Sequence, residues 1–590
     1  MSFYRAFART FWQRPRVALA ALYWHMTGRR VRARNRLRMA AEQAPDAYDV
    51  WIRTVEAASS QPSPPGAKQG SPLISVILHL GAGEPFERSL RALEAQDFAD
   101  WELVMVGVEG SMTRSPKAPR LTIAPGKPDN PGQALSQGVA AASGAFLLPL
   151  PEGAVLPPHA LARHAEAIAA HPAADVLYGD EDRLDRRGRR IRPWFKSRWN
   201  GEMFLAQDYL SGACVIRASA IGGQALVHPS LDEAAPYELL LSVTGVGDHA
   251  IAPQSAGVVH IPHVLAHLPD VEQDDGARSA RVCAVRRRLG PVGATARMGP
   301  FGTVRVEWPL PETDHCPKVS VIIPTRDRVD LLRSAVFGVL DHTNWPNLEV
   351  IVVDNGSQKP EALEFLRQIG ENPKVTVLRD AGEFNFSRLN NRAAACATGA
   401  YLCLLNNDVE MIGDGWLKAL MRQAIRPGAG AVGAKLLYDD GSIQHAGVVI
   451  GMGDAAGHAH RFQKESAEGW FARAHIAHEV SAVTAACLVV DKRKFEAVGG
   501  LDETAFAVAF NDVDLCLKLR SAGWHNIYEP QAVLIHHESK SRGRDTAPRH
   551  IERYRRELAV LQQRWRTVGH VDPLFHPSLD RVSESYCLRL

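Results

Sequence analysis

The stretch that decides the fold is AYLCLLNNDVE (400–410), in which five apolar residues stop abruptly at Asn406, Asn407 and Asp408. A short apolar run bounded by polar residues predicts a strand buried on both faces of a parallel sheet. Ligands of open α/β sheets gather at the carboxyl ends of such strands, so we expect Asp408 on the edge that faces a ligand. An aspartate after a strand is also a common turn residue, and only the surrounding sequence separates these two interpretations.

The composition is that of an ordinary globular protein. The chain has 590 residues, 46% hydrophobic and 23% charged, which predicts two or three domains with their own cores. A net charge of +3 gives no overall argument for nucleic-acid binding, so we expect no nucleic-acid partner. The eight cysteines lack CxxC or metal-type spacing, which favours free thiols in a reducing compartment. No apolar run reaches the length of about 18 residues that spans a bilayer, and we expect a cytoplasmic protein.

Two segments of the chain resemble one another in pattern. In both, strand-like runs alternate with helical patterns, which predicts α/β units. Duplication at this spacing predicts two tandem domains with mostly parallel sheets. The matched stretches are PLISVI (72–77) with PKVSVI (317–322), WELVMV (101–106) with LEVIVV (348–353), and AAASGAFLLPL (140–150) with ACATGAYLCLL (395–405).

Both ends of the chain are basic with helical patterning. Residues 1–40 hold ten arginines and no acidic residue, interleaved with aromatic and aliphatic side chains. This pattern suits either a helix on an anionic membrane surface or an arm that packs on its own domain. Residues 549–566 predict an amphipathic helix, for which packing on the domain is favoured over membrane contact. The expected divisions are a helical arm and linker (1–70), a first unit (71–270), a connector (271–316), a second unit (317–548) and a helical tail (549–590).

Motifs that carry chemistry follow one another in the second unit. SVIIPTRDR ends its first strand, IVVDNGS ends its second, and NNDVE follows the strand at 401–405. FNFSRLNN, VGGLDETAF, FNDVDLCLKLR and HHESKSRG complete the series. The first junction lacks both GxGxxG and GxxxxGK[ST], which argues against a dehydrogenase or a P-loop kinase.

This ordered set resembles glycosyltransferase family 2, over residues 317–544. GAKLLYDDGSIQHAGVV and HHESKSRG look most like its bacterial O-antigen and rhamnosyltransferase-type branch. The resemblance implies an α/β fold of two tandem GT-A domains, Rossmann-like and typical of nucleotide-diphospho-sugar transferases. It also implies an inverting enzyme that moves a sugar, such as rhamnose or another hexose, from a nucleotide-sugar to a growing surface polysaccharide or a lipid-linked glycan.

The resemblance implies a metal site as well. The DxD motif of the family maps onto NND, so Asp408 is the implied ligand of Mg²⁺ or Mn²⁺, while Asn406 departs from the pattern. Such a cation would neutralise the charge that develops on the departing diphosphate. One of two adjacent histidines is the second implied ligand. Because neighbours on a strand face opposite ways, we favour His536 over His537.

A general base and a donor site are implied in the same way. Asp512 would take the proton of the attacking acceptor hydroxyl. Asp514 is expected to face elsewhere, where it either caps the helix or pairs with Lys518, four residues on. Arg542 either contacts the diphosphate or is a solvated loop charge. The implied nucleotide-sugar contacts are Pro324, Thr325, Arg326, Asp354, Arg388, Asn391 and Asn407.

The first unit keeps the strand pattern and loses the chemistry, which predicts a non-catalytic partner domain. Its charged stretches 178–182 and 193–200 either line an acceptor groove or are solvated loops. Laid on the second unit, His79–Leu80 stands for Pro324–Thr325, Val108 for Asp354, Pro151–Glu152–Gly153 for the NND motif and Pro236 for Asp512.

Two main classes of function remain at this point, and a nucleotidyltransferase with the same α/β layout is disfavoured because no glycine-rich phosphate loop opens the fold. The first is a transferase in the cytoplasm, with peripheral contact to the inner face of the cell membrane. The alternative is a non-catalytic glycan-binding or assembly scaffold with decayed transferase sites. Asn406 favours the alternative, whereas Asp408, Asp512 and His536 together oppose it.

Overall fold

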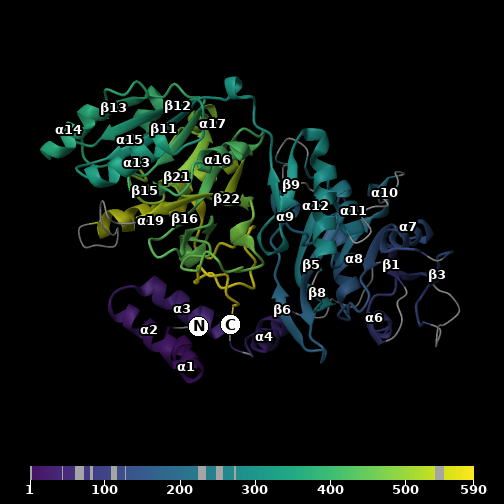
Figure 1. Ribbon diagram of the computed structural model, residues 1–590. Coiled ribbons are helices and arrows are strands. Elements are labelled where there is room, and N and C mark those ends of the chain that lie inside the picture. Colours follow the sequence, from purple (N-terminus) through teal and green to yellow (C-terminus); the bar gives the residue numbers. More distant parts are fainter. Residues whose placement is uncertain are drawn as a thin grey trace.

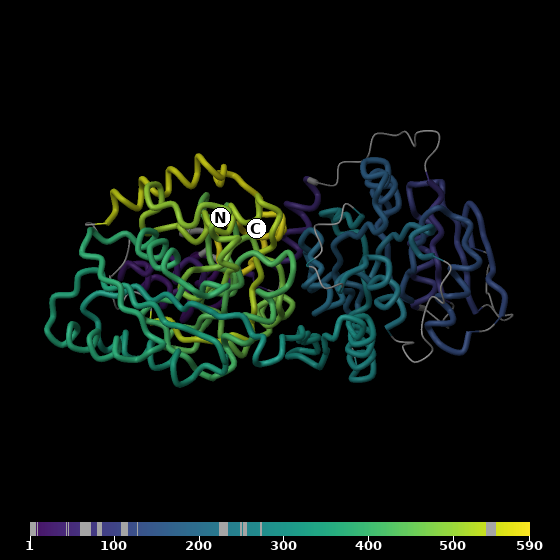
Figure 2. The backbone as a smooth tube through the Cα atoms, turned by 90° about the horizontal axis from the view of Figure 1, so that it is seen from above, coloured from purple at the N-terminus to yellow at the C-terminus, as the bar shows by residue number. Residues whose placement is uncertain are grey.

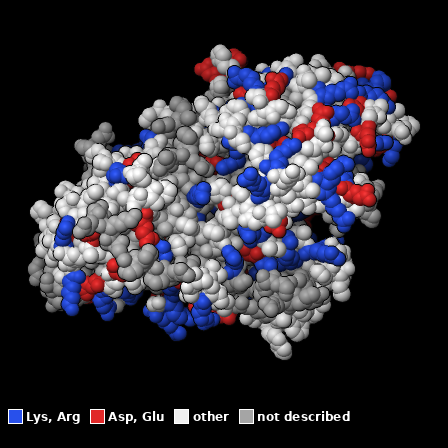
Figure 3. Space-filling model, turned by 180° about the vertical axis from the view of Figure 1, so that it is seen from behind, with Lys and Arg blue, Asp and Glu red and all other residues white. Residues whose placement is uncertain are grey.

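The structure is a computed structural model that describes residues 3–42, 44, 46–59, 72–79, 84–107, 116–126, 128–222, 234–247, 251, 257–271, 274–537 and 550–589. Two α/β units lie side by side, and the N- and C-terminal segments come together beside the second of them (Figures 1 and 2). Basic and acidic side chains are interspersed over the face seen from behind (Figure 3). None of the described helices has the length and apolar content needed to cross a membrane.

The first unit is built on a mixed sheet whose described strands run in the order β3–β2–β1–β4–β7–β5–β6, with β8 beside β5. Its strands are β1 (Ile74–His79), β2 (Trp101–Val106), β3 (Leu121–Ile123), β4 (Phe146–Leu150), β5 (Val176–Leu184), β6 (Arg190–Trp194), β7 (Cys214–Arg217) and β8 (Val258–Pro269). The helices that accompany them are α6 (Glu84–Glu94), α7 (Pro131–Ala141), α8 (Ala160–Ala170), α9 (Gly201–Ala206), α10 (Ala218–Ile221) and α11 (Ala235–Thr244).

The second unit has a larger sheet in the order β13–β12–β11–β14–β21–β16–β22–β15, with β17 beside β16 and β20 beside β22. Its strands are β11 (Val319–Thr325), β12 (Leu348–Asp354), β13 (Val375–Arg379), β14 (Tyr401–Leu405), β15 (Val409–Met411), β16 (Ala429–Leu437), β17 (Ile443–His445), β20 (His478–Val480), β21 (Cys487–Asp491) and β22 (His525–His536). One core lies under α13 (Val329–Asp341), α14 (Pro360–Ile369) and α16 (Trp416–Ala424), and another under α15 (Phe386–Cys396), α17 (Lys492–Ala497) and α18 (Asn511–Ser521). A separate hairpin pairs β18 (Val448–Ile450) with β19 (Ala456–His458).

The two sheets share one topology. β13, β12, β11 and β14 occupy the places of β3, β2, β1 and β4, and β21, β16 and β22 those of β7, β5 and β8. In each sheet one antiparallel strand, β7 or β21, separates a parallel group of strands from a second parallel pair. The expected pair of tandem α/β units is confirmed, and the antiparallel strand is the feature that the repeated motifs did not reveal.

The duplication extends to one buried hydrogen-bond network. In the second unit, Glu349 on β12 accepts from the hydroxyl of Ser320 on β11 at 2.6 Å and from the backbone N–H of Thr398 at 2.7 Å. Gly399 N–H donates to Ser320 Oγ at 2.9 Å. The first unit repeats the network with Glu102, Ser75, Ser143 and Gly144. This network ties three parallel strands together at the end opposite their carboxyl termini.

Replacing Gly399 with alanine is expected to destabilise the second unit by about 1–3 kcal/mol, because a Cβ there would overpack the network. That Cβ would lie 2.6 Å from Ser320 Oγ and 2.8 Å from the carbonyl oxygen of Lys318. Urea unfolding of the full chain measures the change. Gly413→Ala is the matched control, since nothing lies within 4 Å of its Cβ position. Equal unfolding midpoints for the two variants would contradict this account.

The segment expected to be a connector belongs largely to the first unit. α12 (Asp275–Leu289) and the hairpin of β9 (Thr295–Met298) and β10 (Val304–Glu307) bury apolar side chains in the same core as α9 and α11. Arg426 of the second unit stacks over Trp308 at 3.7 Å and donates two hydrogen bonds of 2.7 Å to Glu202 of the first. The units are therefore joined by buried, charge-assisted contacts, which are among the stronger hydrogen bonds in proteins.

The terminal segments fold onto this body. The N-terminal arm forms α1 (Phe3–Gln13), α2 (Pro15–Met26), α3 (Arg30–Glu42), α4 (Ala47–Trp51), a short π-helix (Ile52–Glu56) and α5 (Ala57–Ser59). α19 (Ile551–Trp565) packs on the second unit with Leu561 fully buried, which confirms the favoured interpretation of that helix. The tail then crosses between the units, where Asp572 accepts from Ser481 Oγ at 2.7 Å and Leu574 O accepts from Arg473.

Candidate functional site

Four strands of the second sheet bring candidate residues together where their carboxyl ends meet, which we call the carboxyl edge of the sheet. β11 ends at Thr325, β12 at Asp354 and β22 at His536, and β14 leads directly into Asn407 and Asp408. β14 is buried as predicted, and β11, β12 and β14 are parallel, so their carboxyl ends meet. The amide of Asn407 donates to Thr325 Oγ1 at 3.1 Å, which ties the ends of β11 and β14 together.

Asp408 and His536 face one another at this edge. His536 Nε2 lies 3.1 Å from Asp408 Oδ1 and 3.3 Å from Asn406 Nδ2. On the other side of the ring, His536 Nδ1 lies 2.6 Å from Gln444 Oε1, and the amide nitrogen of Gln444 donates to the carbonyl oxygen of His536 at 3.3 Å. Because the Gln444 oxygen can only accept, His536 Nδ1 carries a proton.

Asp408 and His536 in this arrangement fit a divalent cation. With Nδ1 protonated, a neutral His536 directs the Nε2 lone pair at Asp408 Oδ1, and two acceptors this close need a proton or a cation between them. A carboxylate oxygen and an imidazole nitrogen are both metal ligands, and a metal-bound histidine commonly donates its other N–H to an outer partner. Gln444 is in that outer position. Its sequence context, QHAG at 444–447, gave no role for it, because the partner His536 is 92 residues away.

His537 faces away from this pair. Its Nδ1 pairs with the carboxylate of Asp439, and its Nε2 lies 3.0 Å from Glu410 Oε2. Its backbone N–H donates to the carbonyl oxygen of Asp408 at 2.9 Å. The structure thus brings His536, and not His537, against Asp408. The assignment of His536 as a metal ligand stays a prediction.

Asp512 lies in the first turn of α18, one loop away from the same edge. Its Oδ2 accepts from Ala485 N–H at 3.1 Å and its Oδ1 from Val513 N–H at 2.8 Å. Ala486, the next residue of that loop, accepts from Asn406 N–H at 3.0 Å. Burial raises the pKa of the Asp512 carboxyl above its ordinary value, and the N–H donors only partly oppose this rise. A raised pKa makes Asp512 a better proton acceptor, as a general base requires.

Asp514, two residues after Asp512, contacts helix α19 instead of the carboxyl edge of the sheet. It is fully buried and accepts from Arg564 Nη1 at 2.8 Å and from Trp565 Nε1 at 2.9 Å, both on α19. Lys518 Nζ lies 3.3 Å from its Oδ2, which confirms the expected ion pair. The two carboxylates of the NDVD motif therefore face different surroundings, and Asp514 anchors α19.

Asp354 occupies the end of β12 with both carboxylate oxygens held. Oδ1 accepts from Ser357 N–H at 2.8 Å and Oδ2 from Arg379 Nη1 at 2.8 Å. Asp354 itself is buried, whereas the Arg379 side chain is half exposed. Arg379 is therefore the more accessible member of this pair, and sequence reasoning had not singled it out. Contact of Asp354 with a nucleotide-sugar stays a prediction.

The candidates on α15 both have internal partners. Arg388 forms two hydrogen bonds of 2.9 Å with the carboxylate of Asp380. The amide of Asn391 donates to Leu501 O at 2.8 Å and accepts from Leu501 N–H at 2.9 Å, so it fixes the GGLDE loop. These contacts hold the loops at Asp380 and Leu501 in place beside the carboxyl ends of the strands. Direct contact of either residue with a nucleotide-sugar stays a prediction.

The remaining donor-site candidates lie at the end of β11. Pro324 is buried within the strand, while the Arg326 side chain is half exposed with its Nε 3.9 Å from Asp327 Oδ2. Asp327 adopts a left-handed backbone with φ 54° and accepts from the N–H groups of Gln358 and Lys359. Arg542 lies outside the described residues.

Comparison with known proteins agrees with this architecture. The family model of Glycosyl transferase family 2 matches residues 320–484, which span the strands that carry Thr325, Asp354 and Asp408. This part of the chain belongs to glycosyltransferase family 2.

Three relatives extend the comparison beyond residues 320–484. The chain is 38% identical over 536 residues to the uncharacterized protein y4gI of Sinorhizobium fredii (strain NBRC 101917 / NGR234), covering 87% of this chain and 58% of that protein. It is 34% identical over 502 residues to the O-antigen biosynthesis protein RfbC of Myxococcus xanthus, covering 81% of this chain and 38% of that protein. It is 29% identical over 233 residues to an N-acetylglucosaminyl-diphospho-decaprenol L-rhamnosyltransferase of Mycobacterium tuberculosis, covering 34% and 70%. The chain thus spans little more than half of the first relative and less than half of the second.

The strand pairings of the family 2 unit show what the first unit lacks. Because Ser75 and Ser320 hold equivalent places, His79 takes the place of Pro324, as predicted. The expected match of Val108 to Asp354 is wrong by one residue, because His79 pairs with Val106 and the next position is Gly107. The pairings place Pro151–Glu152–Gly153 opposite NND, Leu268 at His536, and Pro236 of α11 at Asp512 of α18.

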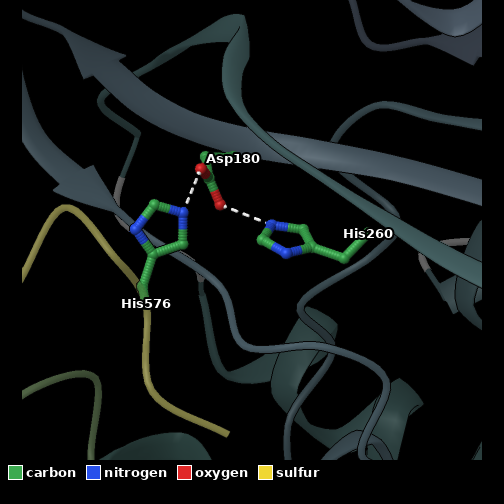
Figure 4. Close-up of side chains that lie close together, drawn as sticks. All are labelled: Asp180, His260 and His576. Carbon is green, nitrogen blue, oxygen red and sulfur yellow. Dashed lines mark hydrogen bonds and ion pairs between the residues drawn. The ribbon is translucent and has the colours of Figure 1, made fainter. Parts of the chain in front are cut away.

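A second cluster of ligand-type side chains lies in the first unit. Asp180 on β5 lies between His260 on β8 and His576 of the C-terminal tail, at 2.8 Å from each (Figure 4). His576 Nδ1 accepts from Ser578 N–H at 2.9 Å, so it is the Nε2 that carries the proton. A metal would need that Nε2 lone pair, so the cluster fits a hydrogen-bonded clamp on the tail and does not fit a metal site.

The charged stretch 178–182 is buried rather than solvated, so the solvated-loop interpretation is wrong. It forms part of β5, where Asp182 is fully buried and accepts from Tyr48 OH at 2.7 Å and from Arg190 Nε at 2.6 Å. Lys196, from the second stretch, is likewise buried and lies 2.7 Å from Glu181. These charges are fixed by one another and by the N-terminal arm.

Proposed function

We propose that the chain is an inverting glycosyltransferase that moves a sugar from a nucleotide-sugar to a growing surface polysaccharide or a lipid-linked glycan. The observation that carries the proposal is the Asp408–His536 pair held by Gln444 at the carboxyl edge of the sheet. The second unit (317–548) is the catalytic domain, and the first (71–270) is a non-catalytic partner. The reaction takes place in the cytoplasm. The branch of family 2 that includes O-antigen and rhamnosyl transfer suits this acceptor class.

Asp408 and His536 would hold the divalent cation, which neutralises the diphosphate that departs with the nucleotide. Because Mg²⁺ prefers oxygen ligands throughout, an imidazole ligand favours Mn²⁺ of the two. Asn406 stands where the family pattern has a carboxylate, and its amide nitrogen lies 3.3 Å from His536 Nε2. With that lone pair engaged, rotation of the Asn406 amide presents its oxygen instead, so the substitution does not disable the site.

Asp512 would accept the proton of the acceptor hydroxyl as that oxygen attacks the anomeric carbon. A single displacement of this kind inverts the anomeric configuration. The donor contacts follow from the strand ends: Thr325 and Asn407 at the joined ends of β11 and β14, Asp354 with Arg379 at the end of β12, and Arg326 on the exposed side. Pro324, Arg388 and Asn391 shape this surface through their packing and hydrogen bonds.

Thermal melting of the full chain against UDP-, GDP- and dTDP-sugars, with and without Mn²⁺, tests the donor site. A ligand that binds only the folded state raises the melting midpoint, so one donor class with Mn²⁺ should raise it. Hydrolysis or transfer of the same sugar should then follow. A midpoint that responds to no donor, together with no turnover, would favour a glycan-binding scaffold.

Gln444→Met is expected to weaken Mn²⁺ binding by about 10- to 100-fold, since His536 loses the acceptor that sets its ring orientation and tautomer. The shift of the melting midpoint with Mn²⁺ concentration measures the affinity independently of turnover. Gln444→Glu is the matched control, because a carboxylate still accepts from His536 Nδ1 and should keep most of the affinity. Unchanged Mn²⁺ binding in Gln444→Met would remove Gln444 from the site.

A further inference from the structure

Helix α2 presents its large side chains outwards. Ala18 and Ala21 are fully buried, whereas Leu19, Tyr23 and Met26 are 53%, 61% and 71% exposed. These three residues follow one another at spacings of four and three, so they form one stripe on the helix surface. Soluble helices bury the large apolar face, and a contiguous exposed one marks a surface for another partner.

Exposed aromatic side chains also lie at the end of α1, shortly before α2 begins, where Trp12 is 85% exposed and Phe11 is also exposed. Trp and Tyr are the aromatic residues that favour the boundary between lipid and water, because each has an apolar ring and one polar group. We call Trp12, Leu19, Tyr23 and Met26 the α1–α2 stripe. Among the described residues these four are the most exposed large apolar side chains of the arm.

The arm is firmly attached to the body through α3, which leaves α2 outermost. Arg32 on α3 lies 3.0 Å from Asp440 of the second unit, and Asn35 Nδ2 donates to Glu584 of the tail at 3.1 Å. Leu37 is fully buried against α2 and α1. The arm therefore packs on its own domain with one side, while the α1–α2 stripe stays uncovered. Packing on its own domain, one of the two interpretations left open by the sequence, is therefore confirmed for α3.

The positive charge of the N-terminal arm indicates that the partner of the α1–α2 stripe is anionic. Residues 1–40 carry ten arginines and no acidic residue. Arg16 precedes Leu19 by about one turn of α2, Arg29 and Arg30 follow the end of α2, and all three are exposed. Arginine side chains pair well with phosphate groups, and basic clusters next to an apolar helix face bind anionic lipid surfaces.

We propose that α1 and α2 dock the protein on an anionic lipid bilayer. The α1–α2 stripe enters the headgroup region, and the exposed arginines contact lipid phosphates. The arm is fixed to the second unit, so docking would hold the carboxyl edge of its sheet at a set height above the bilayer. This inference does not depend on the transfer reaction, and its test uses no substrate.

Co-sedimentation of the full chain with vesicles tests the proposal. We expect binding to phosphatidylcholine vesicles that contain phosphatidylglycerol, weaker binding to pure phosphatidylcholine, and loss of binding as salt screens the arginines. The triple variant Leu19→Ser/Tyr23→Ser/Met26→Ser should lower the affinity by about tenfold or more, because it removes the apolar surface that the bilayer would bury. Val271→Ser/Ile412→Ser/Val568→Ser, which changes three exposed apolar residues elsewhere, is the matched control and should bind like the wild type.

Two further variants separate the contributions. Arg16→Gln/Arg29→Gln/Arg30→Gln should bind more weakly and with a shallower dependence on salt. Trp12→Leu should keep binding while losing part of the quenching of tryptophan fluorescence by brominated lipids. Circular dichroism and the melting midpoint check that each variant is folded.

The proposal is overturned if the wild type fails to bind anionic vesicles, or if the apolar triple variant binds them as well as the wild type does. A triple variant that changes the molar mass in solution with unchanged vesicle binding would make the α1–α2 stripe an interface between copies of the chain.

Discussion

Replacing Asp512 with asparagine is expected to lower the rate of sugar transfer by about 10²- to 10⁴-fold, the contribution of a positioned general base. Asparagine has nearly the same shape and can still accept from one of the N–H groups of Ala485 and Val513. It cannot take a proton from the acceptor hydroxyl. Donor binding should persist, so the melting shift with the nucleotide-sugar should match that of the wild type.

The pH dependence of the rate gives a second signature of Asp512. Its base form is the ionised one, so the rate should fall as pH drops through the raised pKa of the Asp512 carboxyl. An ordinary aspartate titrates near pH 4, and this fall should begin at a higher pH. Burial favours the protonated carboxyl, so Asp512 stabilises the fold at low pH, and that contribution is lost as pH rises. At neutral pH, Asp512→Asn should therefore change the unfolding free energy by no more than about 1 kcal/mol.

Asp514→Asn is the matched control two residues away. It removes the buried charge that Arg564 and Lys518 face, while Arg564 keeps its contact with Asp502 at 2.9 Å, so it should reduce stability by about 1–2 kcal/mol and loosen α19. The rate per folded molecule should stay within a few-fold of the wild type. If Asp512→Asn keeps full activity, or if the activity of Asp514→Asn falls as far, the assignment of the base is wrong.

The sequence was enough to predict the two α/β units, because buried strands appear as apolar runs and the duplicated runs appear twice. It was also enough to place NND at a strand end and to favour one of two adjacent histidines, since strand neighbours face opposite ways. The shift from Val108 to Gly107 shows the limit of this reading. The register of a strand depends on its pairing with strands that are far away in the sequence. A shift of one residue moves every side chain of the strand to the opposite face of the sheet.

What the sequence could not reveal depends on long-range contacts. Gln444 and His536 meet only because β17 and β22 both adjoin β16. Arg379 joins Asp354 because β12 and β13 are neighbours, and the fixed carboxylates of 178–182 find partners in both termini. Such partners lie tens to hundreds of residues away, so no local pattern predicts them.

Asp408→Asn should have the second large effect, a loss of metal-dependent transfer of about 10³-fold, which corresponds to several kcal/mol of charge stabilisation. The magnitude follows from Asn406: the family pattern supplies two carboxylates, whereas here Asp408 is the only one of the three motif residues that carries charge. Asparagine at 408 leaves His536 Nε2 facing a neutral amide. The Mn²⁺-induced rise in melting midpoint should disappear together with the activity.

The neighbouring histidines separate a metal site from a simple ion pair. His536→Ala should raise the Mn²⁺ concentration needed for stabilisation, whereas His537→Ala should leave it unchanged, because His537 contacts Asp439 and Glu410 on the other side of β22. If Asp408 and His536 formed only an ion pair, Asp408→Asn and His536→Ala would both lose stability, and Mn²⁺ would change the melting midpoint of neither the wild type nor these variants. Restoring the family pattern with Asn406→Asp should tighten Mn²⁺ binding, since a second carboxylate then faces the cation. A tighter site in Asn406→Asp that fails in Asp408→Asn would locate the cation at the end of β14.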